Sequence, residues 1–183
     1  MAGMTDESSS TERQQNLWAP WRMEYIDALN EGGAGCFLCR HRDEKDKDQK
    51  NLVLWRGKSS FVCLNRFPYT GGHCLVSPCE HLSELHEVPD ETMTEMIHFL
   101  ADLRKLLAHT MRAEGFNVGL NIGRCAGAGL PGHLHLHIVP RWSGDTNFMS
   151  VFGGVRVIPQ WLETLYAQLR QAGEELKLPR DRP

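Results

Sequence analysis

The 183-residue sequence lacks any apolar run close to the roughly 20 residues that a membrane-spanning helix requires. It also lacks a basic excess, because its formal net charge is −3 with neutral histidines, which argues against binding to long nucleic acid. Its first residues are polar and contain no apolar signal core. We therefore expect a cytoplasmic protein with no membrane or long nucleic-acid partner, and a small anionic ligand stays compatible with this charge.

The length and a hydrophobic content of 41% predict a single domain with a real core, and the chain contains no internal repeat. The first 15 residues are rich in Ser, Thr, Glu and Gln, a composition typical of disorder. We expect a disordered tail over 1–15, one domain over 16–175, and a flexible C-terminus over 176–183.

Hydrophobic periodicity predicts five strands and two helices. The strands are expected at 52–57, 61–66, 73–78, 116–123 and 133–142, and the helices at 88–115 and 160–177. In the long helix, Asp90 is positioned to cap the start, and Gly115 is expected to end it. Short loops favour antiparallel pairing, so the fold class is α+β. The charged run at 40–51 is expected to be a solvated loop or helix end.

The segment GHLHLHIVPRW places His133, His135 and His137 at alternate positions. In a strand they share one face, whereas Leu134, Leu136 and Ile138 point into the core. This pattern is compatible with a solvated strand face, a metal site or a phosphate-handling site. A neutral imidazole can attack phosphorus and form a covalent intermediate, and the preceding loop GRCAGAGLPG could bring backbone N–H groups close to an anion. The combination favours phosphoryl or nucleotidyl transfer.

The sequence has six cysteines, and Cys36 and Cys39 have the spacing of metal ligands. Disulfides are not expected in a cytosolic protein. Redox activity and coincidence are the alternatives to metal binding, and a zinc site requires two further ligands. A thioredoxin-like role is disfavoured because no parallel βαβ pattern surrounds the pair.

The segment HLHLHIVPRW resembles the signature of the histidine triad (HIT) family of nucleotide hydrolases and transferases. FVCLNRFPYTGGHCLVSPCEH is similar to the nucleotide-binding hairpin of this family, and GFNVGLNIGRCAGAG to the strand and loop before the triad. LWAPWRMEYI and GDTNFM resemble the branch containing bacterial diadenosine tetraphosphate hydrolases and phosphorylases. The resemblance covers roughly residues 17 to 170. It implies an antiparallel five-stranded sheet with a long helix and a C-terminal helix, and a homodimer.

The same resemblance assigns roles to individual residues. His135 would be the nucleophile, His137 would contact the phosphate, and His133 would orient the nucleophile or bind zinc. The other nucleotide-binding positions would be Asn65 at the ribose, the apolar side chains around Phe67 at the base, His73 near the phosphates, and Asn121 with the backbone of Gly127 to Gly129 at the phosphate chain. Arg141 would either bring a positive charge to the phosphates or form a salt bridge elsewhere.

The resemblance also implies a structural zinc ion held by Cys36, Cys39, His81 and His133, with His41 as a rival histidine. Magnesium would arrive only with the substrate. The expected reaction is cleavage of a phosphoanhydride, as in diadenosine tetraphosphate, through a nucleotidyl-histidine intermediate. Hydrolysis of nucleoside phosphoramidates and nucleotide binding with little turnover are the alternatives. A zinc hydrolase that uses the triad as its metal site is a third. Many relatives carry Ser, Thr or Gln in the loop before the triad. This chain has no such side chain there, so one donor to the phosphate or leaving group is missing and the sequence does not specify which leaving group is preferred.

Overall fold

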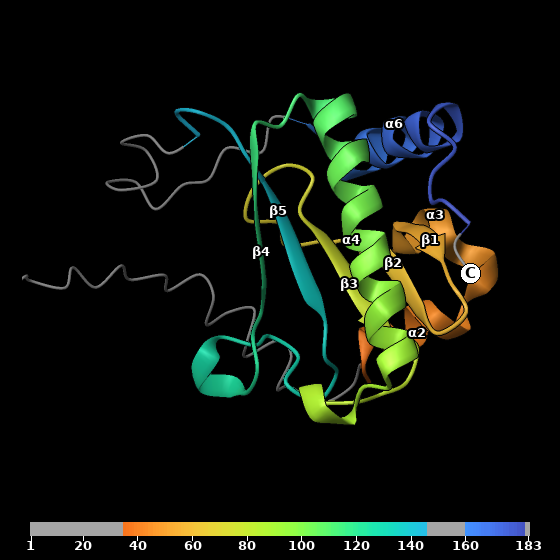
Figure 1. The fold of residues 1–183 in the computed structure, drawn as a ribbon, viewed down its shortest axis with the longest axis vertical. Coiled ribbons are helices and arrows are strands. Elements are labelled where there is room, and N and C mark those ends of the chain that lie inside the picture. Colours follow the sequence, from red (N-terminus) through yellow and green to blue (C-terminus); the bar gives the residue numbers. More distant parts are fainter. Residues whose placement is uncertain (1–34, 146–159, 182–183) are drawn as a thin grey trace, which may run out of the picture.

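The computed structural model describes residues 35–145 and 160–181. The expected tail over 1–15, the segment LWAPWRMEYI and most of GDTNFM lie outside the described residues. Within the described ranges, no helix combines the length and the apolar character needed to span a bilayer. The strands form one sheet, and the long helix lies across it (Figure 1).

The sheet contains five strands: β1 (Val53–Arg56), β2 (Ser60–Leu64), β3 (Cys74–Pro78), β4 (Gly115–Leu120) and β5 (Leu136–Arg141). Their order is β1-β2-β3-β5-β4, and every neighbouring pair is antiparallel. The predicted α+β class with an antiparallel five-stranded sheet is therefore confirmed. The chain crosses over from β3 to β4 through the long helix. β5 then pairs with both β3 and β4, which leaves β4 as an edge strand.

The long helix α4 (Asp90–Met111) covers one face of the sheet. Its fully buried side chains are Met96, Leu103, Leu106 and Leu107, which share a core with Val62, Val76 and Ile138. Pro89, rather than Asp90, is the N-cap residue. The helix ends before Gly115 because Arg112 takes a left-handed conformation with φ of 53°, and Gly115 instead begins β4.

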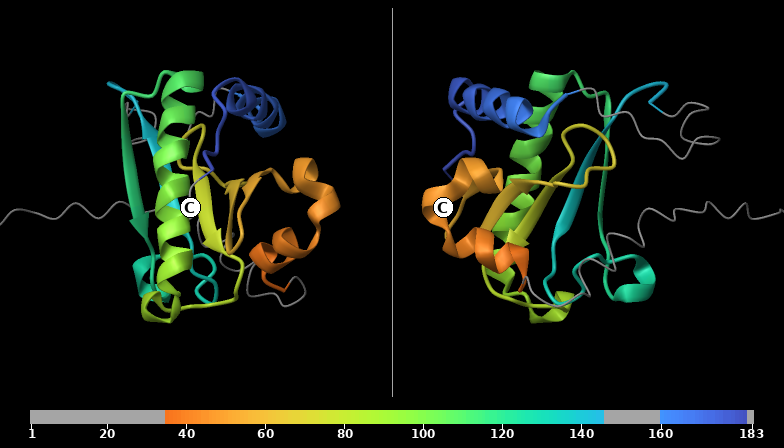
Figure 2. Two further views of the ribbon diagram at one scale, coloured as in Figure 1. Left: turned by 45° about the vertical axis from the view of Figure 1, so that its right-hand side comes forward. Right: turned by 180° about the vertical axis from the view of Figure 1, so that it is seen from behind.

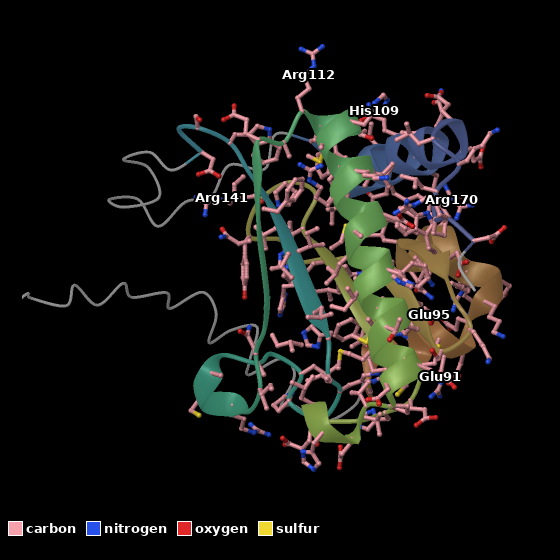
Figure 3. The ribbon with its side chains drawn as sticks, viewed as in Figure 1. Glu91, Glu95, His109, Arg112, Arg141 and Arg170 are labelled. Carbon is pink, nitrogen blue, oxygen red and sulfur yellow. The ribbon has the colours of Figure 1, made fainter. Side chains whose placement is uncertain are left out.

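The C-terminal helix α6 (Leu162–Glu175) packs against α4 and the β1 edge of the sheet. Arg170, seen in Figure 3 on the α6 side of the domain, donates to the carbonyl oxygen of Leu54 at 2.6 Å. After α6, the Arg180 guanidinium pairs with buried Asp102 of α4 at 2.9 Å. The main-chain N–H of Arg180 also donates to Asp102 at 3.0 Å, and Leu178 packs against the core. The flexible C-terminus expected over 176–183 stays a prediction.

Two short helices lie beside β1 and β2, namely α2 (Phe37–Asp43) and α3 (Asp48–Asn51), with the 3₁₀ turn η1 (Lys45–Lys47) between them. The charged run at 40–51 is thus mostly helical. It is anchored by Arg56, whose Nε donates to Asp48 at 3.0 Å. Leu38 of α2 is buried with Phe61 and Leu75, which belong to the sheet face opposite α4.

Figure 2 includes a view from behind in which β3 and β5 lie in front of α4, so this side of the sheet is not covered by the long helix. His137 is directly opposite Leu75 of β3 in the strand register. Residues directly opposite each other share a face, so His137 lies on the sheet side away from α4. The two remaining 3₁₀ turns, η2 (Leu85–Glu87) and η3 (Arg124–Ala126), lie in the connections around this region.

Candidate functional site

The three alternating histidines do not form a solvated strand face. Strand β5 begins only at Leu136, a correction to the strand predicted from residue 133. His133 lies in a bend, and His135 directly precedes the strand. Leu134, Leu136 and Ile138 are buried in the core beneath α4, as expected. His133 is fully buried and His135 is only 7% exposed, so a polar environment inside the protein must satisfy them.

His135 has one defined tautomer. Its Nδ1 lies 2.8 Å from the main-chain carbonyl oxygen of His133. A carbonyl oxygen can only accept a hydrogen bond, so Nδ1 carries the proton and Nε2 keeps an in-plane lone pair. Burial lowers the pKa of His135 from its ordinary value, and the hydrogen bond to His133 opposes this shift. The imidazole is therefore neutral at neutral pH and has the form required of a nucleophile.

His137 lies next to His135, with their ring centroids 4.9 Å apart. Its Nδ1 is 2.9 Å from Nε2 of His73, and its Nε2 is 3.5 Å from the side-chain amide of Asn121. His73 is fully buried. It contacts the Nδ1 side of the His137 ring, and its predicted place near the phosphates stays a prediction.

The loop between β2 and β3 carries three predicted residues, Asn65, Phe67 and His73, and a fourth side chain that the sequence did not single out. Asn65 accepts from the N–H of Phe67 at 3.0 Å, and its Nδ2 lies 3.3 Å from Nδ1 of His73. Phe67 is 60% exposed at the end of this loop. Tyr69 packs its ring against both His73 and His137. Tyr69 could have been singled out from the sequence, because it lies four residues before His73 in a hairpin that was already expected to bind nucleotide.

The glycine-rich loop leads from β4 to His133. Gly127 has a φ of 83°, a conformation that glycine adopts without strain, and its N–H donates to the carbonyl of Arg124 at 3.0 Å. The N–H of Ala128 points to the carbonyl of Gly123 at 3.4 Å, and its side chain is buried. Gly129 follows, half-buried. These two N–H groups thus shape the loop itself, and the loop offers no side-chain hydroxyl or amide between Gly127 and Gly132.

Cys36, Cys39, His81 and His133 come together in one cluster, and their potential ligand atoms all lie within 4.8 Å of one another. Nδ1 of His133 is 3.1 Å from the Cys36 sulfur and 3.5 Å from the Cys39 sulfur, and Nδ1 of His81 is 3.2 Å from the Cys39 sulfur. Ligand atoms around tetrahedral zinc are separated by roughly 3.3–3.8 Å, which these distances approach. The rival His41 does not belong to this cluster. Its side chain is buried and packs edge-on against Phe37, with the two ring centroids 5.4 Å apart.

The protonation of the cluster suits a metal. Nε2 of His133 is 3.0 Å from the carbonyl oxygen of Pro78, so this nitrogen carries the proton and the Nδ1 lone pair faces the sulfurs. Burial raises the pKa of the Cys36 thiol to about 11, and a bound cation would reverse this by stabilising the thiolate. The absence of a side chain at Gly132 lets the His81 ring lie close to the backbone there, because a Cβ at this position would lie only 3.3 Å from Nε2 of His81. The donor set therefore fits zinc.

Arg141 forms the salt bridge that was one of its two expected roles. Its guanidinium contacts Asp145 and also donates to the side-chain oxygen of Asn117 at 2.7 Å. Figure 3 shows Arg141 on the β4–β5 side of the domain, on the opposite side from Arg170. These contacts hold the end of β5 against β4.

Comparison with known proteins gives a consistent result. The family model of the HIT domain matches residues 46–144. A Mycobacterium tuberculosis protein named AP-4-A phosphorylase is 39% identical over 153 residues, covering 81% of this chain and 78% of the relative. A Saccharomyces cerevisiae adenosine 5′-monophosphoramidase is 31% identical over 108 residues, covering 59% and 63%. The crystal structure of a zinc-bound histidine triad protein from Mycobacterium smegmatis aligns with a TM-score of 0.63 at 26% identity, covering 78% of this chain and 96% of that one.

Proposed function

The chain belongs to the HIT domain family, and from this premise we propose that it cleaves a phosphoanhydride of a dinucleoside polyphosphate, such as diadenosine tetraphosphate, through a nucleotidyl-histidine intermediate. The observation that carries the proposal is the tautomer of His135, whose Nδ1–H is held by the His133 carbonyl at 2.8 Å. The similarity to AP-4-A phosphorylase over 81% of the chain supports the choice of substrate.

In the proposed reaction, the Nε2 lone pair of His135 attacks the α-phosphorus, and the bond from phosphorus to the bridging oxygen breaks. The polyphosphate leaves with the bonding electrons, and a phosphoramidate joins the nucleoside monophosphate to His135. Water or inorganic phosphate then attacks the same phosphorus, and the lone pair returns to Nε2. Water yields AMP, whereas phosphate yields ADP, so the enzyme is a hydrolase or a phosphorylase according to the acceptor.

The other residues bind and orient the nucleotide in this proposal. His137 contacts the reacting phosphate beside His135. Asn65 contacts the ribose, Phe67 contributes apolar surface for the base, and Asn121 with the loop from Gly127 to Gly129 holds the phosphate chain. His73 acts on the phosphates only through His137, because its side chain is fully buried. Magnesium accompanying the substrate stays a prediction.

A structural zinc ion is the second part of the proposal, with Cys36, Cys39, His81 and His133 as its ligands. Two thiolates and two imidazoles are a preferred donor set for four-coordinate structural zinc. The zinc-bound relative from Mycobacterium smegmatis supports this assignment. When bound, zinc would link the start of α2 to the segment that carries His135. The six cysteines are all free, which supports a reducing, cytoplasmic location.

The substrate is tested by resolving nucleotides after incubation with diadenosine tetraphosphate, with and without inorganic phosphate. Formation of ADP and ATP only in phosphate identifies a phosphorylase, and formation of AMP and ATP in both conditions identifies a hydrolase. Adenosine 5′-phosphoramidate serves as a third substrate, since the yeast relative is named for this activity. Turnover of the phosphoramidate alone would show that phosphoramidates, and not dinucleoside polyphosphates, are the substrate class. Tight nucleotide binding without any turnover would show that the protein is a nucleotide-binding protein and not an enzyme.

We further propose that two copies pair through β4, whose outer edge is unpaired within the described sheet. Val118 of this strand is 53% exposed, and Ile122 just beyond it is 38% exposed. Val118→Asp is expected to convert a dimer into a monomer in light scattering, because a buried carboxylate would oppose association. Leu176→Asp, at a residue 37% exposed just after α6, is the control that should leave the dimer intact. Equal masses for both variants would contradict a β4 interface.

A further inference from the structure

A chain of hydrogen bonds runs from the loop between β2 and β3 through His73 to His137. Nδ1 of His73 lies 3.1 Å from the main-chain N–H of Tyr69, which can only donate. The same nitrogen faces the Asn65 side-chain amide at 3.3 Å, whose oxygen is already used by the N–H of Phe67. Nδ1 of His73 is therefore an acceptor in the neutral ring, and the proton of His73 resides on Nε2.

The position of the proton on His73 fixes the position of the proton on His137, to which it is hydrogen-bonded. Nε2–H of His73 donates to Nδ1 of His137 over 2.9 Å, so the neutral His137 must carry its own proton on Nε2. Nε2 of His137 lies 3.5 Å from Nδ2 of Asn121, and the ring centroids of His137 and His135 are 4.9 Å apart. Because two N–H groups cannot pair, an Nε2–H on His137 requires the Asn121 amide to be turned so that its Oδ1 accepts. His137 is thereby a donor toward the site, complementary to the oxygens of a phosphate or of a departing polyphosphate.

The Tyr69 ring holds this arrangement together. Its centroid lies 4.6 Å from that of His73 and 6.0 Å from that of His137, and its plane is within 20° of parallel to the His137 ring. One half-buried aromatic side chain therefore covers both members of the hydrogen-bonded pair. The hydroxyl of the next residue, Thr70, donates to the carbonyl of Pro140 at 3.1 Å, which fastens the loop to β5 close to His137.

We propose that Tyr69 is a positioning residue that keeps His137 as an Nε2–H donor by packing over the His73–His137 pair. This inference rests on the proposed function and deepens it, because it names the residue that prepares His137 for contact with the transferred phosphate. Its ring shields the pair from water, which would otherwise compete for both imidazoles and permit the other tautomer. Tyr69 itself does not touch the reacting atoms.

The test compares Tyr69→Leu, which removes the ring, with Tyr69→Phe, which keeps it. Loss of the ring is expected to lower kcat for diadenosine tetraphosphate between about 10- and 100-fold with KM changed less than about threefold, since it disturbs orientation rather than nucleotide binding. Tyr69→Phe should stay within about threefold of the wild type in both constants. If Tyr69→Leu folds poorly by thermal melting, Tyr69→Met supplies a second ring-free variant with an adaptable side chain.

The second readout needs no substrate. Long-range ¹H–¹⁵N NMR of the full-length protein is expected to show His137 as the Nε2–H tautomer in the wild type and in Tyr69→Phe, and as a mixture in Tyr69→Leu. An unchanged His137 tautomer in a folded ring-free variant would overturn the proposal, whatever the kinetics. Because the NMR experiment contains no nucleotide, it also decides the role of Tyr69 if the substrate proposal itself fails.

Discussion

Replacing His135 by glycine is expected to abolish the covalent nucleotidyl adduct and to lower kcat/KM by at least about 10⁴-fold, because it removes the group that bonds to phosphorus in the proposed reaction. The wild-type protein, mixed with diadenosine tetraphosphate and quenched, should gain the mass of one nucleoside monophosphate in intact-protein mass spectrometry. Peptide mapping should place this mass on His135, whose Nε2 is the unprotonated ring nitrogen.

Two controls make this result specific. His109→Ala removes an exposed imidazole of α4 and should retain both adduct and turnover. Glycine at 135 also removes the hydrogen bond to His133, so equal melting temperatures of the two variants are needed to exclude misfolding. An adduct of unchanged yield on the His135→Gly protein would show that another group attacks phosphorus, and the proposed mechanism would be wrong.

Loss of the cysteine–histidine cluster is expected to have the second-largest effect. Cys36→Ser should reduce bound zinc from one equivalent per chain to near zero, as measured by mass spectrometry under native conditions or by a chromogenic chelator. The stability gained from a ligand is about 4 kcal/mol when its free concentration exceeds Kd about 1,000-fold. For a chain of this size, that corresponds to a fall in melting temperature of about 8–16 °C.

The structure extends this prediction from stability to activity. His133 belongs to the cysteine–histidine cluster through its side chain, and its carbonyl holds Nδ1–H of His135. Cys36→Ser should therefore also slow adduct formation, although Cys36 lies in a different element. Cys125→Ser, at an exposed cysteine outside the cluster, is the matched control and should keep zinc, melting temperature and adduct. One equivalent of zinc retained by Cys36→Ser would refute the ligand assignment.

Two errors in the predicted elements have identifiable physical causes, one local in the sequence and one not. The long helix ends at Met111 rather than near Gly115, because Arg112 already adopts the left-handed conformation that glycine was expected to provide. The last strand begins at Leu136 rather than at His133. There the chain is held instead by Leu82, whose carbonyl accepts from the N–H of Leu134, and by Ser77, whose hydroxyl donates to the carbonyl of Leu134 at 3.2 Å. Neither contact is local in the sequence.

What the sequence alone determined was the chemistry of the parts. The alternation of histidine with leucine and isoleucine identified which side chains enter the core, because side chains alternate between the two faces of extended chain. Cys36 and Cys39 have the spacing of metal ligands, and the resemblance supplied the two histidines that the structure brings beside them. Length and short loops were enough for an antiparallel α+β domain.

Only the tertiary structure decided how those parts divide their roles. Hydrogen bonds to carbonyl oxygens of Pro78 and His133 assign the tautomers of His133 and His135. The contact with Pro78 joins segments that only folding brings together, and the local contact with His133 depends on the backbone conformation that the folded chain takes there. Folding likewise buries His73 behind His137 and lays Tyr69 over both rings. Periodicity cannot supply this information, because a repeat along one strand specifies the face of a side chain but not the partner that it meets there.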